Sequence, residues 1–397
     1  MTDRPAPAGT ERDILPDLVR AFALVGIALV NVQYLAWPAM TGYPDAAFAT
    51  QGDVAAYWVV NALFLLKSYT LFAFMFGAGF AYQILSAQRR RAGFSAEYWR
   101  RIVGLFVLGL AHVALLFQGD ILVIYAILGA FLFLFRNAGT RTLIRWAIAV
   151  YVVQILIVVA LAGLAWLGAT MAPEIMAAEA AALQEQADRA TRVFGSAGFA
   201  EAAALRLAEW SEIVVYGLML QGPGAFAFFL FGLAAVRGGA IADAGAPIWR
   251  RSRRIFLPVG LVGSAAGAWV LGQASVMIDP KMLIGMMLIT LFGPFASAGY
   301  IGLIARWAEA PPSATKTFLA RGGTATLTAY LTQSLIFSLI FNAYGLGLFG
   351  SLGVAACTAI AFLVALVSIG FASLWRSRFE RGPMEVLLRR WTYLGTR

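Results

Sequence analysis

Ten long apolar stretches constrain the fold of this chain more than any other feature of its sequence. A bilayer core of about 30 Å is crossed by a helix of roughly 20 mostly apolar residues. Only 13% of the residues are charged, whereas soluble domains carry about 25%. We therefore predict an all-α fold, a polytopic integral membrane bundle of about ten transmembrane helices that forms one membrane domain over residues 1–397. The predicted spans are 18–36, 54–85, 102–117, 121–135, 143–168, 213–236, 255–276, 282–305, 324–345 and 351–374.

The basic residues indicate the orientation of these helices. Lys and Arg gather in alternate segments, and such segments face the cytoplasm. With the N-terminus inside, the inner segments hold 25 of the 30 basic residues, and both termini are predicted to be cytoplasmic. The net charge of +10 then indicates loops beside anionic membrane lipids. It does not indicate a nucleic-acid partner, because no groove of interleaved basic and aromatic residues is present.

Two segments outside the spans are long enough to form helices. Residues 169–212 are predicted to be an extracytoplasmic helical segment between the fifth and sixth spans, which either caps a site or forms a solvated hairpin. The tail from Arg376 onward is predicted to form an interfacial helix on the inner leaflet. The N-terminal residues show no signal-peptide pattern. One cysteine, Cys357, and one histidine leave no basis for a disulfide or a His/Cys metal site, so no metal is predicted.

His112, the only histidine, falls in the third predicted span. It follows Arg101 by 11 residues at about 1.5 Å each, which places it in the outer half of the bilayer. The short turn around Gly119 makes the third and fourth spans an antiparallel hairpin, with Asp120 at its outer mouth. A carboxylate beside an imidazole raises its basicity, as a general base requires. The two residues are the candidate catalytic pair; a packed histidine and a helix-capping aspartate form the open alternative.

Four other polar residues within the spans are candidates for a site, because such residues are costly in a membrane. Arg20 and Asn31 lie eleven positions apart in the first span, which is about three helical turns, so they share one helix face. That face either lines a cavity or carries a headgroup anchor and an interhelical hydrogen bond. Lys67 interrupts the second span, where we expect a break or tilt, unless its stem reaches an interface. Gln333 lies in the ninth span.

Several blocks of the sequence follow one another in an order that covers nearly the whole chain. They are Asp17–Asn31, Leu71–Phe80, His112 with Gly119–Ala126, Arg321–Ser334, Tyr344–Gly350, Phe379–Glu385 and Arg389–Tyr393. In this order they resemble the YeiB-like bacterial membrane proteins, whose C-terminal part is a domain of unknown function. The resemblance implies a YeiB-like block over residues 320–397 with a cytoplasmic interfacial tail, and a place in the bacterial inner (cytoplasmic) membrane.

The YeiB-like proteins are distantly similar to transmembrane acyltransferases, which move an acyl group from cytoplasmic acyl-CoA to a hydroxyl or amine at the other face. Many of these enzymes carry, in the first span, an arginine and a histidine with ten residues between them. Arg20 matches the arginine, but Asn31 stands in place of the histidine, and an amide does not accept a proton at neutral pH.

The resemblance therefore implies an acyltransferase in which the general base has moved to His112, aligned by Asp120. Arg20 and Lys67 would bind the phosphates of acyl-CoA, the donor substrate, with no permanently bound cofactor. Asn31 and Gln333 would stabilise an oxyanion or orient the glycan or lipid acceptor. The alternatives are a transporter or lipid-handling protein without a covalent step, and a structural subunit. A homo-oligomer is also open, since Gly77 and Gly79 suit helix packing within or between subunits.

Overall fold

The structure is a computed structural model, and it describes residues 14–38, 43–91, 93–274 and 278–394. Over these ranges every regular element is a helix and no strand occurs. The elements in chain order are α1 (Leu15–Ala36), η1 (Asp45–Phe48), α2 (Gln51–Leu63), α3 (Lys67–Arg90), α4 (Phe94–Leu115), α5 (Leu122–Leu132), η2 (Phe133–Phe135), α6 (Thr140–Met171), α7 (Pro173–Ser196), α8 (Phe199–Leu220), α9 (Gly222–Arg237), α10 (Pro247–Arg251), the π-helical turn η3 (Ser252–Phe256), α11 (Leu257–Leu271), α12 (Pro280–Glu309), α13 (Ala314–Gly323), α14 (Thr326–Phe341), α15 (Val354–Arg378) and α16 (Pro383–Thr392).

Most of these helices are suited to a membrane. Seven helical segments of the described chain are long and apolar enough to cross one. The pairs α8–α9 and α13–α14 pass the same test only together, and they bend by 56° and 83° at their breaks. The apolar segment Leu122–Phe135 is shorter. Each of the ten predicted spans overlaps one of these segments or pairs. The predicted all-α membrane bundle is therefore confirmed, while ten complete crossings stay a prediction.

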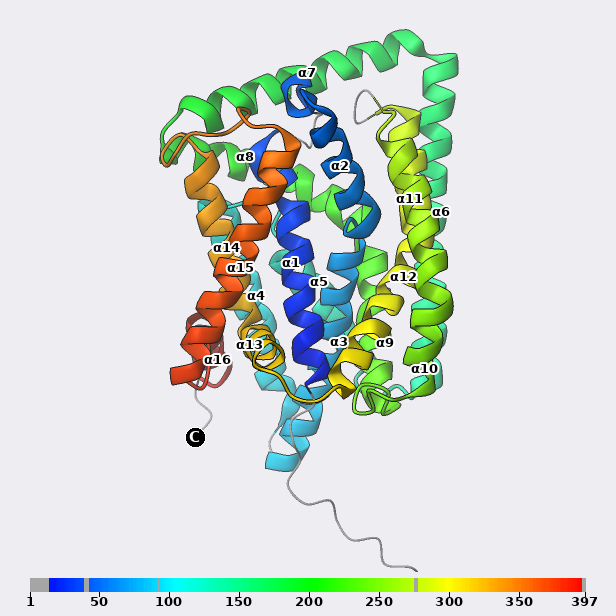
Figure 1. The fold of residues 1–397 in the computed structure, drawn as a ribbon, viewed down its shortest axis with the longest axis vertical. Helices are drawn as coiled ribbons and strands as arrows, with labels where there is room; N and C mark the ends of the chain where they lie inside the picture. Colours follow the sequence, from blue (N-terminus) through cyan, green and yellow to red (C-terminus); the bar gives the residue numbers. More distant parts are fainter. Residues whose placement is uncertain (1–13, 39–42, 92, 275–277, 395–397) are drawn as a thin grey trace, which may run out of the picture.

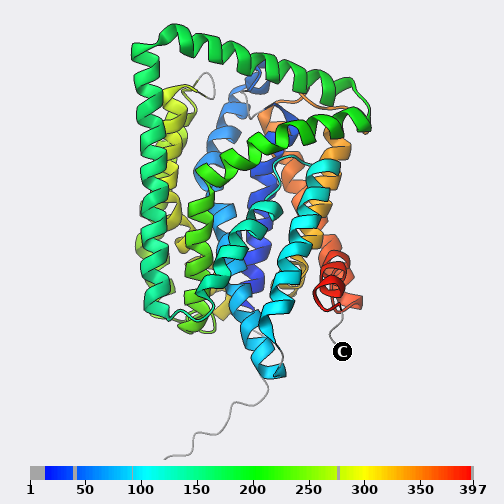
Figure 2. The same cartoon turned by 180° about the vertical axis from the view of Figure 1, so that it is seen from behind.

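The long helices run side by side, and α7 lies across one end of the bundle (Figure 1). The 32-residue helix α6 leads up one edge to α7, and α8 returns obliquely beneath it (Figure 2). The first turn of α1 and the C-terminal helix α16 lie at the opposite end (Figure 1). The described chain thus begins and ends at one end of the bundle, and α7 covers the other. We call these ends inner and outer, after the predicted orientation.

Glycines allow two central helices to touch along their backbones. A Cβ atom on Gly77 of α3 would lie 1.9 Å from the carbonyl oxygen of Phe229 in α9. A Cβ on Gly232 of α9 would lie 1.9 Å from the carbonyl oxygen of Phe74 in α3. Small residues permit such close approach of membrane helices. The predicted packing role of Gly77 is thereby confirmed, whereas a Cβ on Gly79 would meet nothing within 4 Å.

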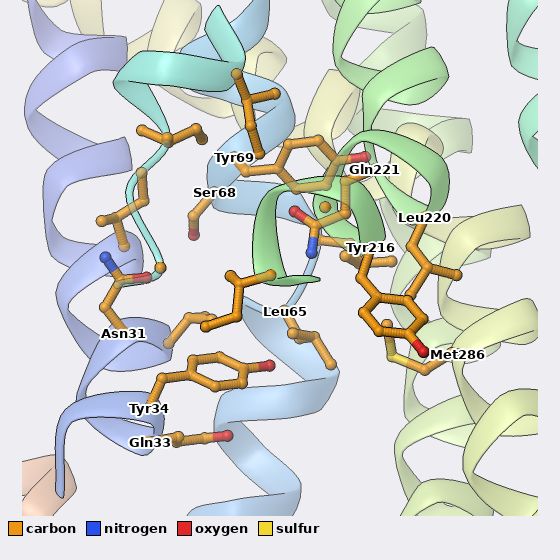
Figure 3. Close-up of a pocket in the computed structure, with 18 of the residues that line it drawn as sticks. Asn31, Gln33, Tyr34, Leu65, Ser68, Tyr69, Tyr216, Leu220, Gln221 and Met286 are labelled. Carbon is orange, nitrogen blue, oxygen red and sulfur yellow. The ribbon is translucent and has the colours of Figure 1, made fainter. Parts of the chain in front are cut away.

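The second predicted span is broken near Lys67, as its length indicated. Helix α2 ends at Leu63, and α3 begins at Lys67. Between them Leu66 has φ 63°, in the left-handed region that a bulky residue rarely adopts. This conformation turns the chain at mid-bundle, so that Leu65 and Ser68 both line the cavity shown in Figure 3.

The buried apolar side chains form two clusters that are stacked along α1. The inner cluster takes residues of α1 up to Ile27, and the outer cluster begins at Ala28. Each cluster surrounds a cavity, and Ile27 lines both cavities. The interior of the bundle is therefore divided near the middle of α1.

Candidate functional site

The candidate site is a buried histidine–aspartate pair at the outer end of α4. His112 lies in the last turn of α4, and its carbonyl accepts the backbone N–H groups of Leu116 and Phe117. The Nδ1 atom of His112 lies 2.7 Å from Oδ1 of Asp120. The second carboxylate oxygen, Oδ2, accepts the N–H of Val123 at 2.8 Å at the start of α5. Asp120 therefore orients the imidazole and caps α5 at once, so the two interpretations drawn from the sequence are compatible.

The other nitrogen of this imidazole is buried and free. His112 is 3% exposed, and its Nε2 atom has no hydrogen-bond partner in the part of the chain that the structure describes. Because the carboxylate of Asp120 only accepts, Nδ1 carries the proton and Nε2 is the basic nitrogen. The imidazole ring packs against the rings of Tyr330 and Phe117, at centroid distances of 5.1 and 6.2 Å. Buried polar atoms without partners are rare, so Nε2 is a candidate for chemistry.

Two cavities meet beside this pair. The outer cavity has a volume of about 250 Å³ and is partly lined by Asp120. The inner cavity has a volume of about 540 Å³. Ile27, Ile121 and Tyr330 line both cavities and therefore form the partition between them. His112 lines neither cavity, but its ring packs against that of Tyr330, which lines both.

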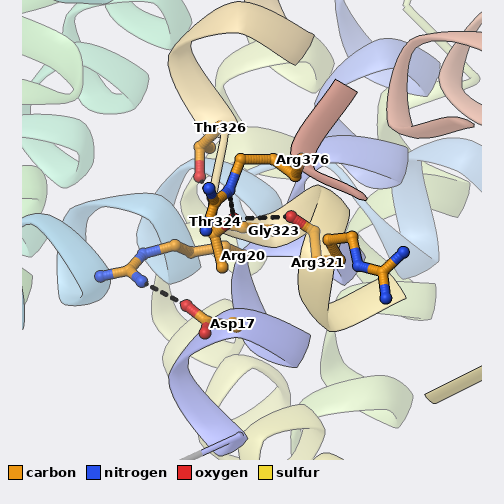
Figure 4. Close-up of polar contacts among 7 residues, drawn as sticks. All are labelled: Asp17, Arg20, Arg321, Gly323, Thr324, Thr326 and Arg376. Atoms are coloured by element: carbon orange, nitrogen blue, oxygen red, sulfur yellow. Dashed lines mark hydrogen bonds and ion pairs between the residues drawn. The ribbon is translucent and has the colours of Figure 1, made fainter. Parts of the chain in front are cut away.

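The inner cavity is cationic. Its charged lining residues are Glu97, Glu385 and five arginines, namely Arg20, Arg90, Arg101, Arg381 and Arg389. Some of this charge is compensated, since Arg90 binds both carboxylate oxygens of Glu97, at 3.1 and 2.6 Å. Arg20 contacts Asp17 at 2.9 Å (Figure 4). Arg101 is half-buried, and it makes no hydrogen bond or ion pair with another described residue. The cavity thus has spare positive charge, which suits an anionic ligand.

The C-terminal helix forms one wall of the inner cavity. Glu385 in its first turn accepts the N–H groups of Leu327 and Thr328, at 2.8 and 3.1 Å, and so caps α14 at its break from α13. Arg376, just before it, donates to the Thr324 hydroxyl at 2.7 Å (Figure 4). The indole of Trp391 donates to the carbonyl of Arg100 in α4 at 2.9 Å. The tail predicted to lie on the membrane surface is therefore docked on the bundle.

Three predicted site residues lie in different surroundings. Asn31 lines the outer cavity, as Figure 3 shows. Lys67 is fully buried, lines neither cavity, and donates to the carbonyl of Asn61 at 3.2 Å. Gln333 lines neither cavity and donates to the Leu24 carbonyl and the Ser368 hydroxyl, at 3.2 and 3.1 Å. The structure brings Arg20 to the inner cavity and Asn31 to the outer one, while Lys67 and Gln333 connect helices.

One residue that supports the site, Arg206 in the predicted outer segment 169–212, was not among the site residues predicted from the sequence. Arg206 is 1% exposed and donates to the Leu115 carbonyl, the Asn342 side chain and the Tyr344 hydroxyl, at 3.2, 3.2 and 2.8 Å. A cation at a helix C-terminus is favourable, and this one fixes the end of α4 that carries His112. No local signal marks it, because its partners come from distant parts of the chain.

Tyr43, which lies between α1 and η1, belongs to the wall of the outer cavity. Burial, followed by the nearby hydroxyls of Tyr57 and Tyr34, raises the pKa of the Tyr43 hydroxyl well above its ordinary value. The hydroxyl is therefore protonated, and it donates to Oε1 of Gln33 at 2.7 Å. No group of three or more His, Cys, Asp or Glu residues that could hold a metal ion is found over the described ranges.

Fold and site together define a polytopic α-helical membrane protein with a buried His–Asp pair between two cavities. Residues 235–395 match the family described as "Protein of unknown function (DUF418)". The chain is 29% identical to the uncharacterized protein YxaH of Bacillus subtilis (strain 168), over 97% of this chain and 95% of that protein. It is 27% identical to the uncharacterized protein YeiB of Escherichia coli (strain K12), over 96% of each. The chain is thus similar to YxaH and YeiB over nearly its whole length, and this confirms the resemblance that its motifs predicted. No solved structure matches it.

Proposed function

We propose that this YeiB-like protein is a transmembrane acyltransferase, which moves an acyl group from cytoplasmic acyl-CoA to a hydroxyl or amine of an acceptor at the outer side. The observation that carries the proposal is the His112–Asp120 pair, whose free Nε2 lies behind the partition between a cationic inner cavity and an outer cavity. An oriented imidazole with a free basic nitrogen is what a general base needs. Two cavities that meet beside it suit two substrates that arrive from opposite sides.

The inner cavity suits the donor. Guanidinium groups bind phosphates through paired, charge-assisted hydrogen bonds, and Arg101 makes no hydrogen bond or ion pair with a described residue that would compete. Arg20 lines the same cavity. Because Lys67 lines neither cavity, we assign the phosphates of CoA to these arginines and not to Lys67. A volume of about 540 Å³ is that of a typical ligand site, and it suits the part of acyl-CoA that enters the bundle.

The chemical step transfers the acyl group directly. Nε2 of His112 takes the proton of the acceptor hydroxyl or amine, and the acceptor atom attacks the thioester carbonyl carbon. The tetrahedral intermediate then collapses, the carbon–sulfur bond breaks, and the imidazolium returns its proton to the CoA thiolate. Since His112 lies behind Tyr330, the step requires the Tyr330 ring to turn aside.

Tyr330 is also the best-placed donor for the developing oxyanion. Its hydroxyl is buried without a hydrogen-bond partner in the described chain, and its side chain lines both cavities. Donors that face the developing charge lower the barrier to acyl transfer. Asn31 in the outer cavity is placed to orient the acceptor, whereas Gln333 is engaged with α1 and α15.

The surroundings of this reaction follow from its two substrates. A donor from the cytoplasm and an acceptor at the outer face require the bacterial inner membrane, with membrane lipids around the bundle. A glycan or a lipid then serves as the acceptor, and a homo-oligomer would need small residues other than Gly77, which packs α3 on α9 within the bundle.

A transporter without a covalent step is the second candidate. It is favoured by the bent pairs α8–α9 and α13–α14, because interrupted helices are common at transporter binding sites. In that case the partition of Ile27, Ile121 and Tyr330 would be a gate, and the His112–Asp120 pair would relay a proton.

The deciding experiment measures binding and turnover with detergent-purified protein. Acetyl-CoA and a long-chain acyl-CoA are tested for binding to the wild type, Arg20→Ala and Arg101→Ala, and free CoA release is then followed with His112→Ala. We expect each arginine variant to bind acyl-CoA about tenfold to a hundredfold more weakly, as for the loss of a charge-assisted hydrogen bond. We expect His112→Ala to lower the rate of CoA release by about 10² to 10⁴.

Arg192→Ala is the matched control, because Arg192 is exposed on α7 and lines neither cavity. It should leave binding and turnover unchanged. Full CoA release by His112→Ala would eliminate this mechanism. Absence of acyl-CoA binding by the wild type would favour transport, which needs sealed vesicles to be observed.

A further inference from the structure

The outer cavity is almost free of charge. Asp120 is its only charged lining residue among the described ones, and its carboxylate is already engaged by His112 and Val123. The rest of the wall consists of apolar side chains, aromatic rings, side-chain amides and the hydroxyl residues Ser68 and Thr290. An ionised ligand would lose its hydration there without gaining a counter-charge, which is unfavourable. The side-chain amides of this wall are those of Asn31, Gln33, Asn61, Gln118 and Gln221.

A buried hydrogen-bond donor in this wall has no partner. Gln33 is 3% exposed, and its Oε1 atom accepts the hydroxyl of Tyr43 at 2.7 Å. Its Nε2 atom is buried and has no hydrogen-bond partner within the described ranges. Such an atom is costly unless something binds to it. Because Gln33 lines the outer cavity, a ligand oxygen in the cavity would satisfy this donor.

The cavity also reaches the surface that faces the membrane. Tyr216 of α8 lines the cavity and is 47% exposed, and its neighbour Val215 is also exposed. In Figure 3 the Tyr216 ring points toward Met286 of α12. Helix α8 bends by 56° from α9 just below this point, so it does not close the side of the bundle as a straight span would.

We propose that the outer cavity binds the head of an uncharged, hydroxyl-bearing amphiphile, which enters sideways from the outer leaflet past Tyr216. The head accepts a hydrogen bond from Nε2 of Gln33, and the apolar chain remains along α8 in the bilayer. A cavity of about 250 Å³ suits a headgroup and not a whole lipid, since drug-sized ligands need about 300 Å³ or more. This assignment deepens the proposed function by naming the class of acceptor, although the binding itself requires no acyl transfer.

The test uses two photoreactive lipids with the same diazirine-bearing acyl chain. One is a monoacylglycerol, which has an uncharged diol head, and the other is the corresponding lysophosphatidic acid. Each is crosslinked to the full chain in nanodiscs without acyl-CoA, and labelled peptides are identified by mass spectrometry. We expect the monoacylglycerol to label residues 210–221 and 282–290 at least about threefold more than the lysophosphatidic acid does. Removal of one hydrogen bond in Gln33→Leu should lower this labelling about threefold to tenfold.

Gln83→Leu is the matched control, because Gln83 lines the inner cavity and should leave the labelling unchanged. Tyr216→Trp, which narrows the entrance, should slow labelling even if Gln33→Leu fails to fold. Equal or stronger labelling by lysophosphatidic acid, or labelling spread evenly over all lipid-facing helices, would overturn the proposal. If the lipid labels the protein as expected but no CoA is released from acyl-CoA, the lipid site is retained and acyl transfer is refuted. If CoA is released but the lipid does not label the protein, acyl transfer is retained and the lipid site is refuted.

Discussion

Asp120 shows how one side chain sets the chemistry of another. Its two carboxylate oxygens accept from Nδ1 of His112 and from the N–H of Val123. An amide in its place has one acceptor only. The helix cap would take that acceptor, and the NH₂ group would face Nδ1 and force the proton of the imidazole onto Nε2. The nitrogen that serves as the base would then be blocked.

We therefore expect Asp120→Asn to lower CoA release by about 10² to 10⁴ while the protein stays folded. The nitrogen-15 spectrum of the single histidine should show the proton on Nδ1 in the wild type and on Nε2 in the variant. Asp188→Asn, at an exposed position of α7, is the control and should change neither the spectrum nor the rate. A variant spectrum that still shows the proton on Nδ1 would contradict this account of the pair.

At the level of helices, the contact between α3 and α9 is determined by glycine. Gly77 and Gly232 bring the two backbones together, and neither contact leaves room for a methyl group, because the nearest atom on each is a carbonyl oxygen. A second glycine, Gly79, follows two residues later in α3, lines the inner cavity and has open space where a Cβ would lie. The same substitution at these two positions therefore separates packing from helix propensity.

Gly77→Ala should destabilise the bundle by about 1–3 kcal/mol, since the added methyl forces α3 away from α9. Gly79→Ala should be neutral or slightly stabilising, because alanine favours the helix. Thermal unfolding of the two variants in one detergent measures the difference. Equal melting temperatures for both would show that α3 and α9 do not pack as closely as described.

The whole molecule has a defined polarity. The inner end combines the cationic cavity, the start of α1 and the helix α16, while α7 and α8 cover the outer end (Figures 1 and 2). The positive-inside rule assigns the inner end to the cytoplasm. In the proposed reaction, donor and acceptor would therefore reach the His112–Asp120 pair from different compartments.

Reporter fusions test this orientation. A green fluorescent protein at the C-terminus should fluoresce, because it folds in the cytoplasm. Alkaline phosphatase inserted at Ala197, between α7 and α8, should be active, because that enzyme needs the oxidising outer compartment. The same phosphatase inserted at Pro311, between α12 and α13, is the control and should be inactive. The reverse pattern of phosphatase activities would invert the assignment of both cavities.

Several features followed from short stretches of sequence. The hydropathy pattern predicted the all-α membrane bundle, the length of the second span predicted its break before Lys67, and the short turn after His112 predicted that Asp120 lies near the imidazole. Other assignments needed the packed bundle. Lys67 and Gln333 resemble site residues in the sequence, but both donate hydrogen bonds to neighbouring helices and line neither cavity. Whether a polar group in a membrane faces a cavity or another helix depends on how the helices pack. The sequence of one span does not contain that information.

The sequence by itself determined the class of protein, its similarity to YeiB and its expected orientation, because hydropathy, charge and motif order are properties of the linear chain. Only the tertiary structure decided where the cavities lie and which side chains remain unpaired beside them. Arg206 binds groups more than 90 residues away at both α4 and α14, and Tyr330 reaches His112 from the far end of the chain. Such contacts form because each helix buries its polar groups against whichever neighbours the bundle provides.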